Sequence, residues 1–176
     1  MVQLFKLLNS AVASRVLLFF LKSPTKKAYA GKILKEMEIS KKSLFDSLVK
    51  LKGEGYLDAT QIGRTISYSL NRNNPVVKQL KILLTLSELV PKIKHFEGKA
   101  EAYLYGSAAR GEDTESSDLD LLIISKMGKV ELMHSVREMS KEKTKFVILT
   151  PIEYARLAHS DTPFYERIEK DKIRLV

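Results

Sequence analysis

Two short polar motifs in the second half of the chain have the residue types and spacing of a site for phosphate chemistry. Gly106-Ser107 follows an apolar stretch, and after ten intervening residues Asp118-Leu119-Asp120 leads into a second apolar stretch, Leu121 to Ile124. Both stretches are typical of strands, and carboxylates two positions apart on a strand point to one face. Such a pair of hard oxygen ligands suits Mg²⁺, which would bridge nucleotide phosphates during in-line phosphoryl transfer.

The residues that follow the first apolar stretch could contact the phosphates directly. Gly106 lets the backbone approach a phosphate closely, and Ser107, at an expected helix start, offers a hydroxyl and an N–H as donors. Arg110, one turn further on, could add a cationic contact, and Gly111 would allow the turn that follows. The two motifs together predict one nucleotide-binding site.

Gly-Ser, ten residues and Asp-x-Asp, in this order, resemble the signature of the DNA polymerase beta-like nucleotidyltransferase superfamily. The match is closest to its minimal nucleotidyltransferases, small proteins often paired with a helical partner in prokaryotic toxin–antitoxin loci. It covers about residues 97–176. The resemblance implies that Asp118 and Asp120 are the catalytic carboxylates and bind Mg²⁺ or Mn²⁺. It also implies that a nucleoside triphosphate is contacted by Gly106, Ser107 and Arg110.

The chain departs from that superfamily at one position. Active members usually carry a third carboxylate on the next core strand, as the base or a second metal ligand. The corresponding segment here, Lys145 to Leu149, contains no acid, while Glu142 precedes it and Glu153 follows it. Whether this domain transfers a nucleotide or only binds one is therefore left open by the sequence.

The charge of the chain is concentrated away from these motifs. Residues 1–74 contain 13 Lys and Arg and 5 Asp and Glu, whereas residues 99–176 contain 13 and 14, with an acidic cluster from Glu112 to Asp120. A basic N-terminal part attracts polyanions, which favours a nucleic-acid partner. The alternative is a lysine-rich surface whose only role is solubility.

The periodicity of residues 1–74 predicts three helices and a hairpin. Apolar residues fill 9–22, and Pro24 stops that run; Ala30, Ile33, Leu34 and Met37 form one helical stripe. Ser40 is the expected N-cap of a third helix, which Gly53 and Gly55 would end. Residues 56–60 and 65–70 are then expected as paired strands, with the tip at 61–64.

Three helices followed by a hairpin with a basic tip resemble the winged helix-turn-helix fold of archaeal and bacterial transcription regulators, over about residues 9–72. The segment ILKEMEISKKSLFDSLVKLKGEGYLDA is similar to the second helix, turn, recognition helix and first wing strand of that family. The N-terminal residues of a recognition helix lie nearest the bases. We therefore expect contacts with double-stranded DNA from Lys41, Lys42, Ser43, Asp46, Lys50 and, at the wing tip, Arg64. A winged helix used only for protein contacts is the alternative.

The segment between the two halves predicts a long apolar helix. Asn73-Asn74-Pro75 would start it, and Pro91 would bound it, with six Leu or Val residues from Leu80 to Val90. A helix this apolar must bury more than one face. It either forms a homodimer with a second copy, as we favour, or packs within its own chain.

The composition of the chain restricts its expected cellular location and the kinds of site that it can contain. The chain has no cysteine, which excludes disulfides and thiolate metal sites, and its longest apolar run, Val16 to Leu21, is too short to span a membrane. No signal-peptide pattern precedes it. We expect a soluble cytoplasmic protein without a membrane partner.

The expected fold class is α+β, in three parts. A winged helix-turn-helix DNA-binding domain occupies residues 1–74, a connector or dimerisation helix residues 75–96, and a small nucleotidyltransferase-like α/β domain with a mixed sheet residues 97–176. Its end is expected as helices at 152–159 and 163–170 and a strand at 173–176. Three functions follow: a DNA-binding regulator that binds Mg-nucleotide with weak or no turnover; an active Mg-dependent nucleotidyltransferase acting on a protein or small molecule; or an antitoxin-like protein that binds a helical partner.

Overall fold

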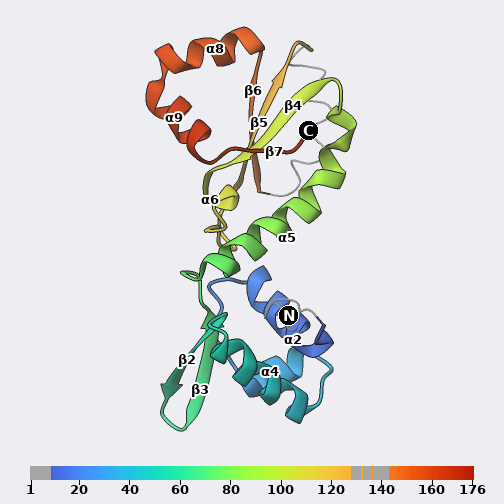
Figure 1. Ribbon diagram of the computed structural model, residues 1–176, viewed down its shortest axis with the longest axis vertical. Coiled ribbons are helices and arrows are strands. Elements are labelled where there is room, and N and C mark those ends of the chain that lie inside the picture. Colours follow the sequence, from blue (N-terminus) through green and yellow to red (C-terminus); the bar gives the residue numbers. More distant parts are fainter. Residues whose placement is uncertain (1–8, 128–131, 133–135, 137–142) are drawn as a thin grey trace. The chain divides into compact units, whose positions relative to one another are not determined.

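The computed structural model describes residues 9–127, 132, 136 and 143–176 of the chain (Figure 1). The chain separates into two compact units, which divide between Lys78 and Gln79. Among the described helices, none combines the length and the apolar character needed to cross a membrane.

The first unit combines three helices with a small antiparallel sheet. In chain order its elements are α2 (Ala11–Lys22), β1 (Ala28–Tyr29), α3 (Ala30–Glu36), α4 (Lys41–Gly53), β2 (Leu57–Ile62) and β3 (Thr65–Leu70). The strands are ordered β1-β3-β2, and both pairings are antiparallel. The three helices and the hairpin predicted for this region are present, and β1 is an additional strand.

Local signals set the helix starts, and apolar burial holds the helices together. Ser40 caps α4, since its hydroxyl accepts a hydrogen bond of 3.1 Å from the Ser43 N–H. Phe20 on α2, Ile33 on α3 and Leu48 on α4 are fully buried, and α4 contacts both α2 and α3. Burying side chains of this size contributes about 1.5–3 kcal/mol each, which a short helix such as α3 needs to be stable.

Two predicted details of the first unit are wrong. Met37 lies just outside α3. Its N–H still donates a hydrogen bond to the Ile33 carbonyl, but its φ and ψ of −132° and 126° are extended, so the helix ends there. The hairpin tip is shorter than predicted, because pairing continues to Ile62 and Thr65 and leaves only Gly63 and Arg64. Gly63 has φ +59°, a left-handed conformation that glycine adopts without strain.

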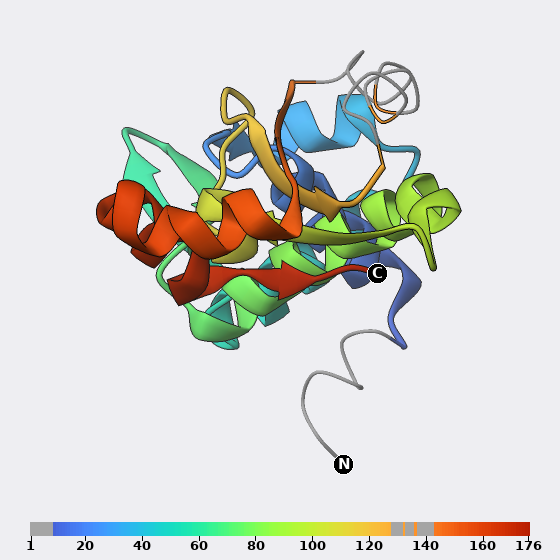
Figure 2. The ribbon, with the colours of Figure 1, turned by 90° about the horizontal axis from the view of Figure 1, so that it is seen from above.

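The second unit is built on a mixed four-stranded sheet. Its elements are most of α5 (Pro75–Ile93), the 3₁₀ turn η1 (Lys94–Phe96), β4 (Ala100–Tyr105), α6 (Gly106–Ala109), β5 (Leu119–Ser125), β6 (Thr144–Leu149), α8 (Pro151–Ser160), α9 (Thr162–Asp171) and β7 (Ile173–Arg174). The strand order is β6-β5-β4-β7. Only β5 and β6 are parallel, and Figure 2 shows β7 beside β4. The two helices and the strand predicted for the end of the chain are confirmed, with small shifts at their ends.

Helices cover both faces of this sheet. On one face Leu104, Leu121 and Ile123 pack with Leu89 and Ile93 of α5. On the opposite face the buried side chains of Tyr105, Leu122 and Ile124 pack with Ile168 of α9 and with apolar residues of α8. The alternation along each strand therefore sends Asp120, one residue from Leu121, to the α8–α9 side.

The prediction that Pro91 bounds the connector helix is wrong, since α5 continues to Ile93. Proline inside a helix costs roughly 3 kcal/mol. Leu89 and Ile93, on either side of it, are both buried, and each contributes about 1.5–3 kcal/mol. The two burials together offset the cost of the proline.

Candidate functional site

The two halves of the motif meet at the adjoining ends of β4 and β5. Tyr105 is paired in register with Asp120, so Gly106, the next residue along the chain, lies against the Asp120 side chain. A Cβ atom on Gly106 would lie 2.7 Å from Asp120 Oδ2, and Gly106 has φ +76°. Both the space and the backbone conformation therefore require glycine here.

Ser107 and Arg110 lie just beyond this point, and their surroundings differ. Ser107 is in the four-residue helix α6 and is half-buried. The Arg110 guanidinium is already held by two carboxylates, with Nε 2.9 Å from Glu112 and Nη1 2.6 Å from Asp171. The hydrogen bonds that the guanidinium donates to these two carboxylates raise the pKa of Arg110. Arg110 thus joins α6 to the end of α9, and a phosphate would have to compete for it.

The strand that should carry a third acid carries a lysine beside the aspartate pair. β6 runs parallel to β5 with Lys145 in register with Asp120, so both side chains lie on one face. The Lys145 ammonium is 2.7 Å from Asp118 Oδ2. Asp120 is in β5, but Asp118 lies just before the first residue of that strand. The prediction that both carboxylates lie on one strand is therefore met only by Asp120.

Burial raises the pKa of Asp120 above its ordinary value, and the nearby Asp118 carboxylate adds to this effect. The ammonium of Lys145 and the guanidinium of Arg167 act in the opposite direction. Asp120 is therefore a partly desolvated carboxylate whose charge is stabilised by two cations.

An open pocket of about 710 Å³ lies at this place. Its volume is within the range of small-molecule sites. It is lined by Tyr105, Gly106, Ser107, Arg110, Asp120, Lys145, Phe146, Val147, Phe164 and Arg167. Four of the five predicted site residues line it, and the fifth, Asp118, touches it through Lys145.

Two pocket residues from α9 were missed by the sequence reasoning. The Arg167 guanidinium lies 5.0 Å from the centre of the Phe164 ring, three positions earlier on the helix. An aromatic residue and an arginine at this spacing share one helix face, which is a usable signal. What could not be predicted is that α9 packs over this end of the sheet.

Of the two acids that flank β6 in the sequence, the structure describes only Glu153. Glu153 caps α8, where its carboxylate accepts a 2.7 Å hydrogen bond from the Thr150 N–H. Glu142 lies outside the described residues. Across the described part of the chain, no cluster of three or more His, Asp or Glu residues has the arrangement of a metal site.

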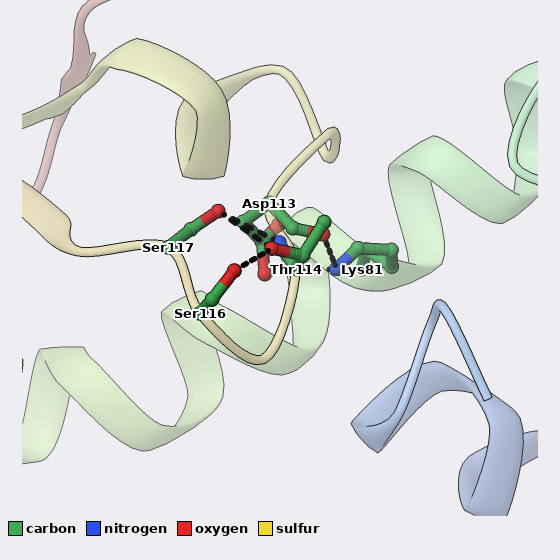
Figure 3. A network of polar contacts seen from close by, with 5 residues as sticks. All are labelled: Lys81, Asp113, Thr114, Ser116 and Ser117. Carbon is green, nitrogen blue, oxygen red and sulfur yellow. Dashed lines mark hydrogen bonds and ion pairs between the residues drawn. The ribbon is translucent and has the colours of Figure 1, made fainter.

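A buried ion pair fixes the loop that leads to Asp118 (Figure 3). Lys81, on α5, is 3% exposed, and its ammonium lies 2.8 Å from Asp113 Oδ2 and 2.9 Å from the Asp113 carbonyl. Beyond Asp113 the loop is closed by a 2.9 Å bond from the Thr114 N–H to the Ser117 hydroxyl. Helix α5 thus holds the segment between the two motifs.

The residues predicted to contact DNA are mostly exposed on the first unit. Lys41, Lys42 and Asp46 are exposed on α4, and Arg64 is exposed at the hairpin tip. Lys50 is partly buried and already interacts with another part of the protein. Ser43 is less available than predicted, since its hydroxyl is bonded to the Ser40 hydroxyl at 2.8 Å.

Sequence reasoning did not anticipate the exposed apolar side chains on the same helix. Phe45 is 40% exposed and Val49 is 67% exposed, between the lysines of α4. Their helical spacing of four residues puts them on one face. The sequence did contain a signal for their exposure. Leu44, Leu48 and Leu51 form the buried stripe of the helix, and Phe45 and Val49 fall outside that stripe.

One family of known proteins matches the chain within the second unit. No curated protein matches the chain. A solved structure from Sulfolobus solfataricus, described as a candidate nucleotidyltransferase, has 21% identity and a TM-score of 0.38, covering 55% of this chain and 84% of that one. A mutant of the toxin–antitoxin complex MntA–HpeT has 11% identity and a TM-score of 0.38, covering 52% and 72%. The nucleotidyltransferase domain family matches residues 86–174, just over half of the chain, and this span includes the whole pocket, so the chain belongs to that family.

Proposed function

We propose that the protein is a DNA-binding regulator whose nucleotidyltransferase domain binds a metal–nucleotide complex with weak or no turnover. The expectation of weak or no turnover rests on the lysine that lies beside the aspartate pair. Lys145 is the β6 residue in register with Asp120, and none of the residues of β6 is acidic. A third carboxylate to deprotonate an acceptor hydroxyl is therefore missing from the strand where the family carries it.

The residues of the site suit a divalent ion that is bound together with a nucleotide. Mg²⁺ commonly uses one or two carboxylates and takes its remaining ligands from water and phosphate. Asp118 and Asp120 would supply the two carboxylates, and Gly106, which has no side chain, leaves the Asp120 oxygen uncovered. When bound, the ion would neutralise the charge that develops on the phosphates. Ser107 and Arg167 then remain to orient the triphosphate.

The proposal for DNA rests on the architecture and charge of the first unit. Its helix–strand–helix–helix–hairpin order, with β1 beside β3, supports a winged helix with α4 as the recognition helix. The ammonium groups of Lys41 and Lys42 and the guanidinium of Arg64 suit phosphate contacts. Phe45 and Val49 offer apolar contacts of the kind that thymine methyl groups receive in the major groove.

The test uses the full-length protein. It is incubated with each labelled nucleoside triphosphate and Mg²⁺ or Mn²⁺, and binding and label transfer to cell extract are measured separately. We expect metal-dependent binding that the Asp118→Ala/Asp120→Ala variant loses, with little transfer by either protein. Robust transfer by the wild type alone would replace the proposal with the second candidate, an active nucleotidyltransferase, which the intact Gly106-Ser107 and Asp118-Leu119-Asp120 favour.

The DNA part is tested on its own, with a random duplex library selected once with thymine and once with uracil. Uracil lacks the methyl group, so selection by the wild type should weaken in the uracil library. A Phe45→Ala/Val49→Ala variant should distinguish the two libraries less than the wild type does. If no duplex binds at low salt, the alternative of an antitoxin-like protein with a helical protein partner takes its place.

The proposal includes a homodimer formed through α5. Leu83 is 62% exposed, and Val76 and Val90, each seven residues from it, are also exposed. Apolar residues every seven positions on one helix face suit pairing with a second helix. The chain's own core uses other residues of α5, namely Leu86, Leu89 and Ile93.

A further inference from the structure

We propose that Lys145 is a built-in counter-cation that occupies Asp118 while the site is free of metal and moves to the nucleotide phosphates when a metal–nucleotide complex enters. This inference rests on the proposed nucleotide binding and concerns its regulation. It implies that one side chain weakens the binding of free metal and strengthens the binding of nucleotide without metal.

The position of Lys145 in the sheet makes it a permanent neighbour of both aspartates. The parallel pairing of β5 and β6 fixes its Cα opposite that of Asp120, and its ammonium reaches Asp118 Oδ2 at 2.7 Å. Both carboxylates act on it, since they raise the pKa of Lys145. An ion that binds Asp118 must therefore displace this ammonium or accept it as a close neighbour of like charge.

The contact is weak enough to be exchanged. The Lys145 side chain is 69% exposed and that of Asp118 is 37% exposed. Ion pairs this exposed contribute little to stability, so displacement by a divalent ion is feasible. Lysine suits the exchange because its ammonium is carried on four flexible methylene groups and donates in three directions.

The charges of the site support a second partner for the displaced ammonium. Asp118 and Asp120 provide two negative charges, and Lys145 and Arg167 provide positive charges that act on Asp120. Arg110 also lines the pocket, but its guanidinium is already held by Glu112 and Asp171. Lys145 therefore offsets one aspartate charge, which favours the binding of a triphosphate without metal. Removing Lys145 leaves that charge uncompensated, and the phosphates are repelled until a divalent ion is bound.

The experiment measures two affinities in one variant, Lys145→Met, which keeps most of the length of the side chain and removes its charge. Mn²⁺ is titrated without nucleotide by electron paramagnetic resonance. ATP, GTP, CTP and UTP are each titrated in EDTA by calorimetry. We expect Mn²⁺ affinity to rise by about two- to fivefold and the EDTA nucleotide affinity to fall by a similar factor, the scale of an exposed ion pair.

Lys143→Met is the matched control, because it removes the same charge two residues away. The Lys143 ammonium lies 3.4 Å from the Glu115 carbonyl, and Lys143 is not among the residues of the pocket. It should change neither affinity by as much as Lys145→Met does. Lys145→Arg should stay close to wild type in both titrations.

The two affinities must move in opposite directions in Lys145→Met. An unchanged Mn²⁺ affinity, or a change that Lys143→Met reproduces, would overturn the inference. If the Mn²⁺ affinity rises as expected but no nucleotide binds with or without metal, the role of Lys145 toward the metal stands while the proposed nucleotide binding fails.

Discussion

Replacing Lys81 with methionine should destabilise the second unit more than the loss of any exposed charge. Methionine keeps most of the apolar stem of Lys81 but leaves the Asp113 carboxylate without its cation. Asp113 Oδ1 is already buried without a hydrogen-bond partner among the described residues, so the carboxylate depends on Lys81 for charge compensation. Breaking a buried ion pair from one side costs about 3–5 kcal/mol.

The exposure of the partners places the effect within that range. Lys81 is 3% exposed, but the Asp113 side chain is 21% exposed, and water therefore reaches part of the carboxylate. We expect the lower end, about 3 kcal/mol, for Lys81→Met. Adding Asp113→Asn removes the uncompensated charge, so the double variant should recover roughly half of the loss.

The assay must report on the second unit alone, since two units need not unfold together. Urea unfolding read by pulsed hydrogen exchange, in peptides from β4 and β5, meets this need. Exchange in residues 113–117 should also rise under native conditions, because Lys81 holds that loop. Lys94→Met, an exposed lysine of the same unit, is the control and should stay within about 0.5 kcal/mol. A loss below about 1 kcal/mol for Lys81→Met, or a double variant less stable than the single one, would refute the reasoning.

Three further predictions use the other parts of the chain. The affinity of the full-length protein for duplex DNA should fall with salt at a log–log slope of roughly −0.9 per phosphate neutralised. Lys41→Ala/Lys42→Ala should flatten that slope in a filter-binding titration. A slope that the variant leaves unchanged contradicts the phosphate contacts. Because burial raises the pKa of Asp120 in the folded state, the ionised form destabilises the fold, so stability is lost as pH rises from the ordinary aspartate range through the raised pKa. In metal-free calorimetry Asp120→Asn should therefore melt above wild type at pH 7, and the difference should shrink toward pH 3; a variant that melts lower at pH 7 would show that the charge is net stabilising. Leu83→Glu should convert the proposed dimer to monomers in sedimentation without unfolding either unit, since Leu83 is exposed, and a wild type that is already monomeric at micromolar concentration rules out the dimer.

Much of the local structure follows from short-range rules that the sequence contains. Ser40 as an N-cap, the glycine at the hairpin tip and the apolar spacing of α4 act between residues three or four positions apart, and the structure has each of them. The same is true of the strands before and after Gly106-Ser107 and Asp118-Leu119-Asp120. Where local rules fail, as at Pro91, the burial of Leu89 and Ile93 in the tertiary core outweighs the local preference.

The site was only half predictable, and the reason is the sheet. The sequence determined that two aspartates and a Gly-Ser turn would come together, because one strand–helix–strand segment contains them all. Only the tertiary structure decided that Lys145 lies in register with Asp120, that Arg167 lines the same pocket, and that Lys81 holds the intervening loop. These contacts join residues about 25 to 50 positions apart in the sequence. Their partners are set by strand order, register and helix packing, which depend on the burial of whole faces and not on the pattern of any one segment.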